Sequence, residues 1–123
     1  MVQRSLVSVV DDDESVRESL PDLLRQFGFA VQVFSSAEAF LASELVSQTN
    51  CLILDIAMPG MSGLELQQEL IRRRQAMPIV FITAHADKTV RPRLLAQGAA
   101  ECLFKPFSDD ALLEALTNAL GMR

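Results

Sequence analysis

The chain has 123 residues, of which 50% are hydrophobic and 22% are charged, and its formal net charge at pH 7 is −5. This length allows one core, so we expect residues 1–123 to form a single domain. The negative charge argues against nucleic-acid binding by this domain. The sequence contains no apolar stretch long enough to span a bilayer, so we expect no membrane segment.

No charged leader precedes an apolar segment, so nothing in the sequence indicates export. The two cysteines, Cys51 and Cys102, lie in apolar runs and lack the spacing of a Cys or Cys/His metal site. We interpret both thiols as small core residues of a protein in the reducing cytoplasm.

Five short apolar runs alternate with segments whose apolar residues recur every three or four positions. The runs predict strands at Leu6–Val10, Ala30–Phe34, Cys51–Leu54, Ile79–Ile82 and Cys102–Phe104. Strict alternation of strand and helix predicts an α/β fold in three layers, with a parallel sheet between helices and right-handed crossovers.

Residues typical of helix ends mark the boundaries of the five predicted helices. They are Asp13 or Glu14 and Gly28 for the first helix, Ser35 with Glu38 for the second, Ser62 with Glu65 for the third, Gly98 for the fourth and Ser108 for the last. Because proline is favourable at a first helical position, Pro92 predicts that the fourth helix begins near Arg91.

Polar residues follow four of the predicted strands, where the carboxyl ends of parallel strands share one edge of the sheet. Asp11 and Asp12 follow the first strand, Asp55 the third, Thr83 the fourth and Lys105 the fifth. Three clustered carboxylates repel one another unless a cation lies between them or their pKa values shift. Hard oxygen ligands suit Mg²⁺ or Mn²⁺, and a free carboxylate could accept a phosphoryl group.

Each of these residues alone has an ordinary structural explanation. An acidic residue after a strand often caps the next helix, a threonine is frequent in strands, and a lysine before proline is usually solvated. Their joint occurrence at four strand ends is much harder to explain in that way and favours phosphoryl-group chemistry, which depends on positioning and charge neutralisation.

At this point the chain resembles the receiver domain of two-component response regulators over essentially its whole length. The matching motifs are Val9–Asp13, Leu54–Gly63, Ile82–Ala84 and Phe104–Phe107. The segments Ser36–Leu41 and Thr83–Asp87 are similar to the FixJ-type branch of that family.

The resemblance implies a flavodoxin-like (βα)5 fold with strand order 2-1-3-4-5. It implies that Asp55 accepts a phosphoryl group from a histidine kinase, which makes the domain a signalling switch of a phosphorelay and not a turnover enzyme. Receiver pairs of the family often associate through the fourth helix, fifth strand and fifth helix, so a homodimer through that face is also implied.

The family further implies a Mg²⁺ site in which Asp12 binds the ion directly and Asp11 mainly through water. Asp55 and the backbone carbonyl of Ala57 would complete the protein ligands. Thr83 would then bond a phosphoryl oxygen, and Lys105 would pair with the phosphoryl group. The resemblance also implies a cis bond between Lys105 and the proline after it.

Two positions near this site are distinctive. Family members usually carry a tyrosine or phenylalanine three residues before the lysine, where this chain has Cys102, too small to report a movement of Thr83 as a ring would. Either Cys102 is a modest variant in a working switch, or the output depends on backbone movement of the fourth helix region. His85 follows Thr83 by two residues and is either an ordinary exposed loop residue or a modulator of acyl-phosphate lifetime.

Three other functions stay open from the sequence. A Mg²⁺-dependent phosphohydrolase of the haloacid-dehalogenase type also needs Asp, Thr and Lys at strand ends, but its second Asp would fall at Ala57. A binding module that has lost phosphorylation is the second, although the acidic, Thr and Lys residues are all present. The third is a stand-alone relay receiver, whereas the resemblance to the FixJ-type branch implies control of transcription through a helix-turn-helix DNA-binding domain that is absent from this chain.

Overall fold

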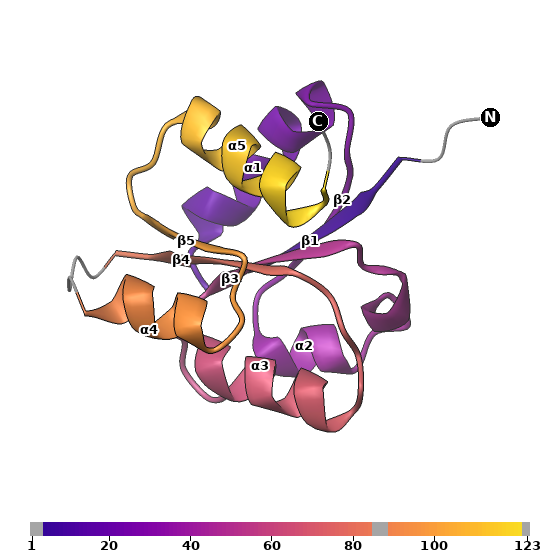
Figure 1. The fold of residues 1–123 in the computed structure, drawn as a ribbon. Coiled ribbons are helices and arrows are strands. Elements are labelled where there is room, and N and C mark those ends of the chain that lie inside the picture. Colours follow the sequence, from indigo (N-terminus) through magenta and orange to yellow (C-terminus); the bar gives the residue numbers. More distant parts are fainter. Residues whose placement is uncertain (1–3, 85–88, 122–123) are drawn as a thin grey trace.

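Strands and helices alternate along the whole chain in the computed structural model, which describes residues 4–84 and 89–121 (Figure 1). The elements are β1 Leu6–Val10, α1 Glu14–Gln26, β2 Ala30–Phe34, α2 Ala37–Leu41, the 3-10 turn η1 Val46–Gln48, β3 Cys51–Asp55, α3 Gly63–Arg72, β4 Ile79–Thr83, α4 Val90–Ala96, β5 Glu101–Phe104 and α5 Asp109–Ala119. Within these described ranges, every helix is too short or too polar to cross a membrane.

The five strands form one parallel sheet in the order β2-β1-β3-β4-β5, which confirms the predicted fold and topology. The observed bounds of β1 and β2 equal the predicted ones. The other three strands are one residue longer, because Asp55 pairs with Ile82, Thr83 with Phe104 and Glu101 with Val80. Two residues of the candidate site therefore belong to the strands themselves.

Helices cover both faces of the sheet: α1 and α5 lie on one face, and α2, α3 and α4 on the other (Figure 1). Because successive strand residues point to opposite faces, each strand contributes to two separate apolar clusters. Cys51 and Ile53 pack with the α1–α5 face, whereas Leu52 and Leu54 pack with the other face. All five residues of β3 are buried, as expected for a central parallel strand.

Most predicted helix boundaries are confirmed. Asp13 caps α1 by accepting a hydrogen bond from the Ser15 backbone N–H at 2.9 Å, and Ser108 caps α5. Ser62 and Glu65 form the predicted reciprocal capping box of α3. Gly28 and Gly98 follow the ends of α1 and α4 with positive φ angles of 96° and 100°, as expected after a helix.

The predicted cap of α2 is wrong by one residue. Ser36, and not Ser35, caps α2, because its hydroxyl accepts a 3.0 Å hydrogen bond from the Ala39 N–H. Glu38 does not complete a capping box there and instead binds the loop after β3. Helix α4 begins at Val90, near Arg91 as predicted, but Pro92 is its third residue and not its first. Proline is tolerated there because the first-turn N–H groups have no intrahelical partner.

Candidate functional site

The carboxyl ends of β1, β3, β4 and β5 bring the predicted site residues together at one edge of the sheet. Asp11 directly follows β1, Asp55 ends β3 and Thr83 ends β4. Lys105 follows β5, and its backbone N–H donates a 2.7 Å hydrogen bond to the Thr83 carbonyl. The parallel ladder thus fixes the backbone beneath each of these side chains.

Three carboxylates gather at this edge. One oxygen from each of Asp11, Asp12 and Asp55 lies within 4.8 Å of the others. Asp11 and Asp55 are buried, whereas Asp12 is exposed and connects the cluster to solvent. The cluster therefore has an open side through which an ion or a small group could reach it.

Lys105 is the cation beside the cluster. Its Nζ lies 2.8 Å from Asp11 Oδ2 and 3.9 Å from Asp55 Oδ1. The Lys105–Pro106 peptide bond is cis, as the family resemblance implied. One ammonium group therefore balances part of the negative charge of three carboxylates, and the remaining charge is uncompensated within the described residues.

The pKa of Asp55 is raised to about 7. Burial of the carboxyl is the main cause, followed by the negative charge of Asp11 and by hydrogen bonds of the protonated carboxyl with Asp11 and Asp12. Lys105 acts in the opposite direction but does not outweigh them. A second cation at the cluster would favour the ionised form, and only the ionised carboxylate is a nucleophile.

Asp11 is held in place by several hydrogen bonds. Its Oδ1 accepts a 2.9 Å hydrogen bond from the Asp13 N–H, and its Oδ2 binds Lys105. Its backbone carbonyl accepts a 3.0 Å hydrogen bond from Arg17 Nη1 in α1. Arg17 was missed at the sequence level, because an arginine on a half-exposed helix face gives no sign that it reaches back to the strand end.

The loop between β3 and α3 is tied down at both of its ends. The Gly63 N–H donates to the Ile56 carbonyl at 2.9 Å, and the Met61 N–H donates to Glu38 Oε2 at 3.0 Å. A Cβ atom on Gly63 would lie 2.3 Å from the carbonyl oxygen of Asp55, so only glycine fits there. Ala57 lies in this loop and is exposed. That its backbone carbonyl binds the metal ion stays a prediction.

The remaining predicted residues have different outcomes. Thr83 is buried at the end of β4, next to the cluster in the strand order. Cys102 is buried in β5, paired with Phe81, and packs with the apolar cluster on the α2–α4 face. Burial raises the pKa of its thiol, which keeps it protonated. His85 lies outside the described residues.

The residues present fit a hard divalent cation. Closely spaced carboxylates at an open, acidic edge supply the oxygen ligands that Mg²⁺ prefers, and the described part of the cluster contains no histidine or cysteine ligand. Burial and the charge of Asp11 raise the pKa of Asp55, and a bound cation would lower that pKa by stabilising the ionised carboxylate.

A hollow of about 650 Å³ opens beside Lys105. Helix α1 lines it with Val16, Leu20 and Leu23, and the loop after β5 lines it with Pro106 and Phe107. The hollow therefore joins apolar side chains to the lysine of the cluster. Such a surface suits a protein partner that must reach the strand-end edge.

The fold and this strand-end cluster are those of a receiver domain, and the chain belongs to that family: the family model of the response regulator receiver domain matches residues 7–117. Receiver domains are signalling switches of two-component systems and interact with histidine kinases.

Individual relatives agree with this assignment. The chain is 44% identical to Nodulation protein W of Bradyrhizobium diazoefficiens over 116 residues, which cover 94% of this chain and 51% of that protein. It is 43% identical to Transcriptional regulatory protein FixJ of Azorhizobium caulinodans, covering 94% of this chain and 54% of that one. The chain thus spans about half the length of these curated relatives.

Among solved structures, that of the response regulator StyR superposes with a TM-score of 0.88 at 49% identity, covering 97% of this chain and 60% of that chain. The likeness to FixJ bears out the branch that the sequence motifs indicated.

Proposed function

We propose that Asp55 is the phosphoryl acceptor of this receiver domain. The observation that carries the proposal is the position of its carboxylate, which lies at the end of the central strand among Asp11, Asp12 and Lys105. A carboxylate oxygen of Asp55 attacks the phosphorus of a kinase phosphohistidine. The new O–P bond forms as the P–N bond breaks, and the imidazole leaves with its electron pair and takes up a proton.

Asp11, Asp12, Asp55 and the backbone carbonyl of Ala57 would hold Mg²⁺, or Mn²⁺, at the open side of the cluster. The bound ion supplies Lewis-acid neutralisation of the phosphoryl oxygens. The three carboxylates within 4.8 Å support this ligand set, and Asp12, which is exposed, is the first of them that an incoming ion meets.

Lys105 and Thr83 would respond to the new charge on Asp55. The Lys105 ammonium is 3.9 Å from Asp55 Oδ1, so a small side-chain movement brings it to a phosphoryl oxygen. The Thr83 side chain would hydrogen-bond a second phosphoryl oxygen. Because the Thr83 carbonyl accepts a hydrogen bond from the Lys105 N–H, a backbone movement at one residue would be passed to the other.

The phosphohistidine donor would approach over the hollow beside Lys105. Its apolar rim on α1 and at Phe107 would pack against the kinase, and the cluster lies directly at its edge. The polar residues Ser19 and Asp109 at the same hollow supply partner-specific contacts. The donor would then lie on the side of the sheet that α1 and α5 cover (Figure 1).

The output would pass through the face formed by α4, β5 and α5. Arg91 of α4 and Glu101 of β5 form an ion pair of 2.8 Å there, and the same carboxylate accepts the Cys102 N–H at 2.9 Å. We propose that phosphorylation shifts α4 against β5 through the backbone, since Cys102 has no ring to rotate. The same face would form a receiver homodimer.

In the whole protein, this switch would control transcription through a DNA-binding domain elsewhere in the chain. The support is the similarity to FixJ, a transcriptional regulatory protein of which this chain matches about half. We further propose that the domain does not turn over phosphate esters, because Ala57 stands where a second catalytic carboxylate would be needed.

The test is incubation with phosphoramidate, a small phosphohistidine analogue, and Mg²⁺, followed by intact-mass analysis. We expect a mass increase of one phosphoryl group in the wild type and none in Asp55→Asn. Asp22→Asn, an exposed carboxylate on α1, is the matched control and should be modified normally. Full modification of Asp55→Asn, or steady hydrolysis of a phosphate ester by the wild type, would contradict the proposal.

A further inference from the structure

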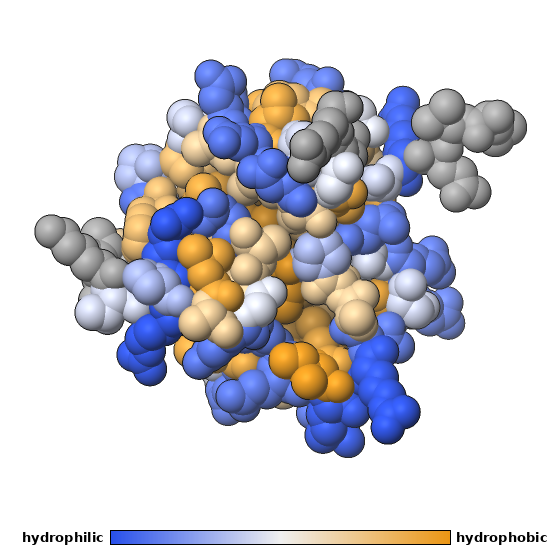
Figure 2. All heavy atoms as spheres, viewed as in Figure 1, coloured by the Kyte–Doolittle hydropathy of each residue, from blue (hydrophilic) through white to orange (hydrophobic). Residues whose placement is uncertain are grey.

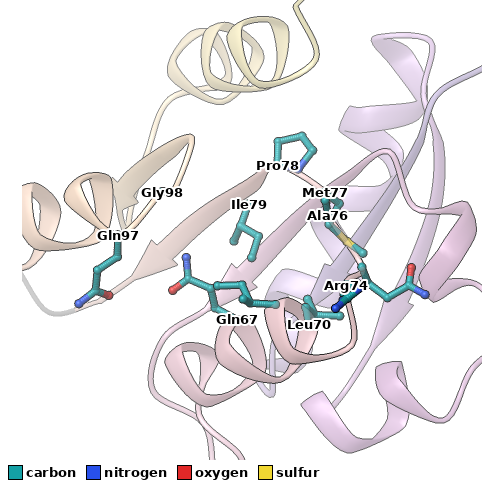
Figure 3. A pocket seen from close by; sticks show the side chains of 11 residues that line it. Gln67, Leu70, Arg74, Ala76, Met77, Pro78, Ile79, Gln97 and Gly98 are labelled. Atoms are coloured by element: carbon teal, nitrogen blue, oxygen red, sulfur yellow. The ribbon is translucent and has the colours of Figure 1, made fainter.

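A second hollow, of about 560 Å³, lies at the opposite end of β4 from Thr83. The end of α3, the loop before β4 and the end of α4 enclose it, and its apolar walls include Leu70, Met77 and Ile79 (Figure 3). Figure 2 shows hydrophobic atoms at the surface in this region, between hydrophilic residues. Its volume and apolar lining are those of a small-molecule site.

One polar side chain lines this hollow and has no protein partner for its carboxamide among the described residues. Gln67 of α3 is only 6% exposed, yet its carboxamide forms no hydrogen bond with any residue in the described ranges. Figure 3 shows it projecting from α3 into the space between Ile79 and Gln97. Every fully buried side-chain N or O atom in the described ranges has a hydrogen-bond partner, so the polar atoms of the Gln67 carboxamide are open to the hollow and can bond a ligand that enters it.

Arg74 lines the same hollow and has an unusual backbone. The end of α3 closes with hydrogen bonds from the Gln75 N–H to the Leu70 carbonyl and from the Arg74 N–H to the Ile71 carbonyl, which form a Schellman motif. Arg74 occupies the position that glycine usually takes, with a φ angle of +57°. A non-glycine residue is strained there, and such strain is often found at functional positions.

The guanidinium of Arg74 is also available. Its neighbours Arg72 and Arg73 both bind Glu69, at 2.5 and 2.7 Å, whereas Arg74 forms no ion pair with any described residue. Three arginines against one carboxylate make this corner positive in a chain whose net charge is −5. The positive charge at the rim therefore complements an anion and not a cation.

We propose that this hollow binds a small amphipathic anion, with a ring or short-chain apolar body and one carboxylate or sulfonate group. The apolar body would lie against Leu70, Met77 and Ile79. The Gln67 carboxamide would hydrogen-bond a polar atom of the ligand, and the anionic group would pair with Arg74 at the rim. The site is separate from the phosphoryl-acceptor cluster and does not rest on the function proposed for it.

The test uses anilinonaphthalene sulfonate, which has an aromatic body and one anionic group, and its uncharged analogue phenylnaphthylamine. Fluorescence titration of the folded chain should give saturable binding of the sulfonate. Arg74→Gln should weaken that binding about tenfold, the effect of one charge-assisted hydrogen bond, and should change binding of the uncharged analogue less than about twofold.

Arg73→Gln is the matched control, because it makes the same charge change one residue away and Arg73 does not line the hollow. It should weaken binding of the sulfonate less than about twofold, because it removes only a neighbouring charge and no direct contact. In heteronuclear NMR spectra, the sulfonate should shift the side-chain amide signals of Gln67 and not those of Gln68, which is exposed. Equal weakening by the two arginine variants, or unshifted Gln67 signals at saturation, would overturn the proposal.

Discussion

Lys105 Nζ lies 2.8 Å from Asp11 Oδ2 and 3.9 Å from Asp55 Oδ1. The lysine is therefore engaged mainly by the carboxylate that we assign to metal binding and only loosely by the proposed acceptor. Lys105 and a divalent cation compete for the same negative charge on Asp11, and this competition leads to the first prediction.

Lys105→Met should make the fold less stable without Mg²⁺ and more responsive to Mg²⁺. Removing the ammonium leaves Asp11 buried without its cation, which we expect to cost about 2 kcal/mol of unfolding free energy, less than for a fully buried pair because Lys105 is partly exposed. The same change should tighten Mg²⁺ binding several-fold. Thermal unfolding across a Mg²⁺ titration measures both effects.

Arg91→Met is the control for that experiment, because it also removes a positive charge from an ion pair, with Glu101, outside the acidic cluster. Its response to Mg²⁺ should equal that of the wild type. If Lys105→Met and Arg91→Met respond alike to Mg²⁺, the lysine does not compete with the ion.

The stability of the protein without divalent cations should fall as the pH rises. Because folding raises the pKa of Asp55 from 3.8 to about 7, its carboxyl favours the folded state most below pH 3.8, and this contribution is lost as the pH rises through 7. Asp55→Asn cannot ionise, so it should be more stable than the wild type at about pH 8, by about 1–2 kcal/mol after allowance for solvent screening.

Chemical denaturation in EDTA at several pH values measures this difference. The advantage of Asp55→Asn should shrink as the pH is lowered and vanish near the unfolded-state pKa of an aspartate, about 4. Asp22→Asn, which removes an exposed carboxylate of α1, is the control variant. A difference between Asp55→Asn and the wild type that is constant with pH would contradict the raised pKa.

Gly63→Ala should disturb both the fold and the proposed acceptor. The new Cβ would lie 2.3 Å from the Asp55 carbonyl oxygen, so the β3–α3 loop must move, at an expected cost of about 2 kcal/mol or more. Phosphoramidate labelling should also slow. Ser62→Ala, which loses only the helix cap, should cost about 1 kcal/mol and leave labelling unchanged. Equal labelling rates in both variants would show that the loop does not position Asp55.

Arg74→Gly should stabilise the fold although it removes a side chain. Relief of the left-handed strain outweighs the added freedom of glycine in the unfolded chain, for a net gain of about 0.5–1 kcal/mol. The melting temperature should rise by about 2–4 °C. Arg73→Gly, at a right-handed backbone position, should lower it. A fall of similar size in both variants would argue against strain at Arg74.

The strands and the acidic cluster could be predicted because both depend on local patterns. Apolar runs identify buried parallel strands, and the carboxyl ends of parallel strands share an edge, so Asp11, Asp55 and Thr83 had to come together. The exact cap of α2 was ambiguous, because Ser35 and Ser36 both have side chains that can cap. Only the three-dimensional structure shows that Ser36 takes the role and that Glu38 binds the Met61 N–H.

The second hollow could not be predicted in this way. In the sequence, Gln67 cannot be distinguished from any other polar residue of α3. Its burial depends on how α4 and the loop before β4 pack against it. Arg74 likewise reads as one of three consecutive arginines, and its positive φ angle follows from the closing turn of α3. Such features depend on packing between distant segments, which a sequence pattern does not report.

The sheet also separates the two thiols. Cys51 faces the α1–α5 side and Cys102 the α2–α4 side, both buried and unpaired. They cannot meet in the folded chain without breaking the sheet that lies between them. Any disulfide that this domain forms on storage must therefore begin in molecules that have opened, and the amount of oxidised material on a non-reducing gel becomes a cumulative record of unfolding.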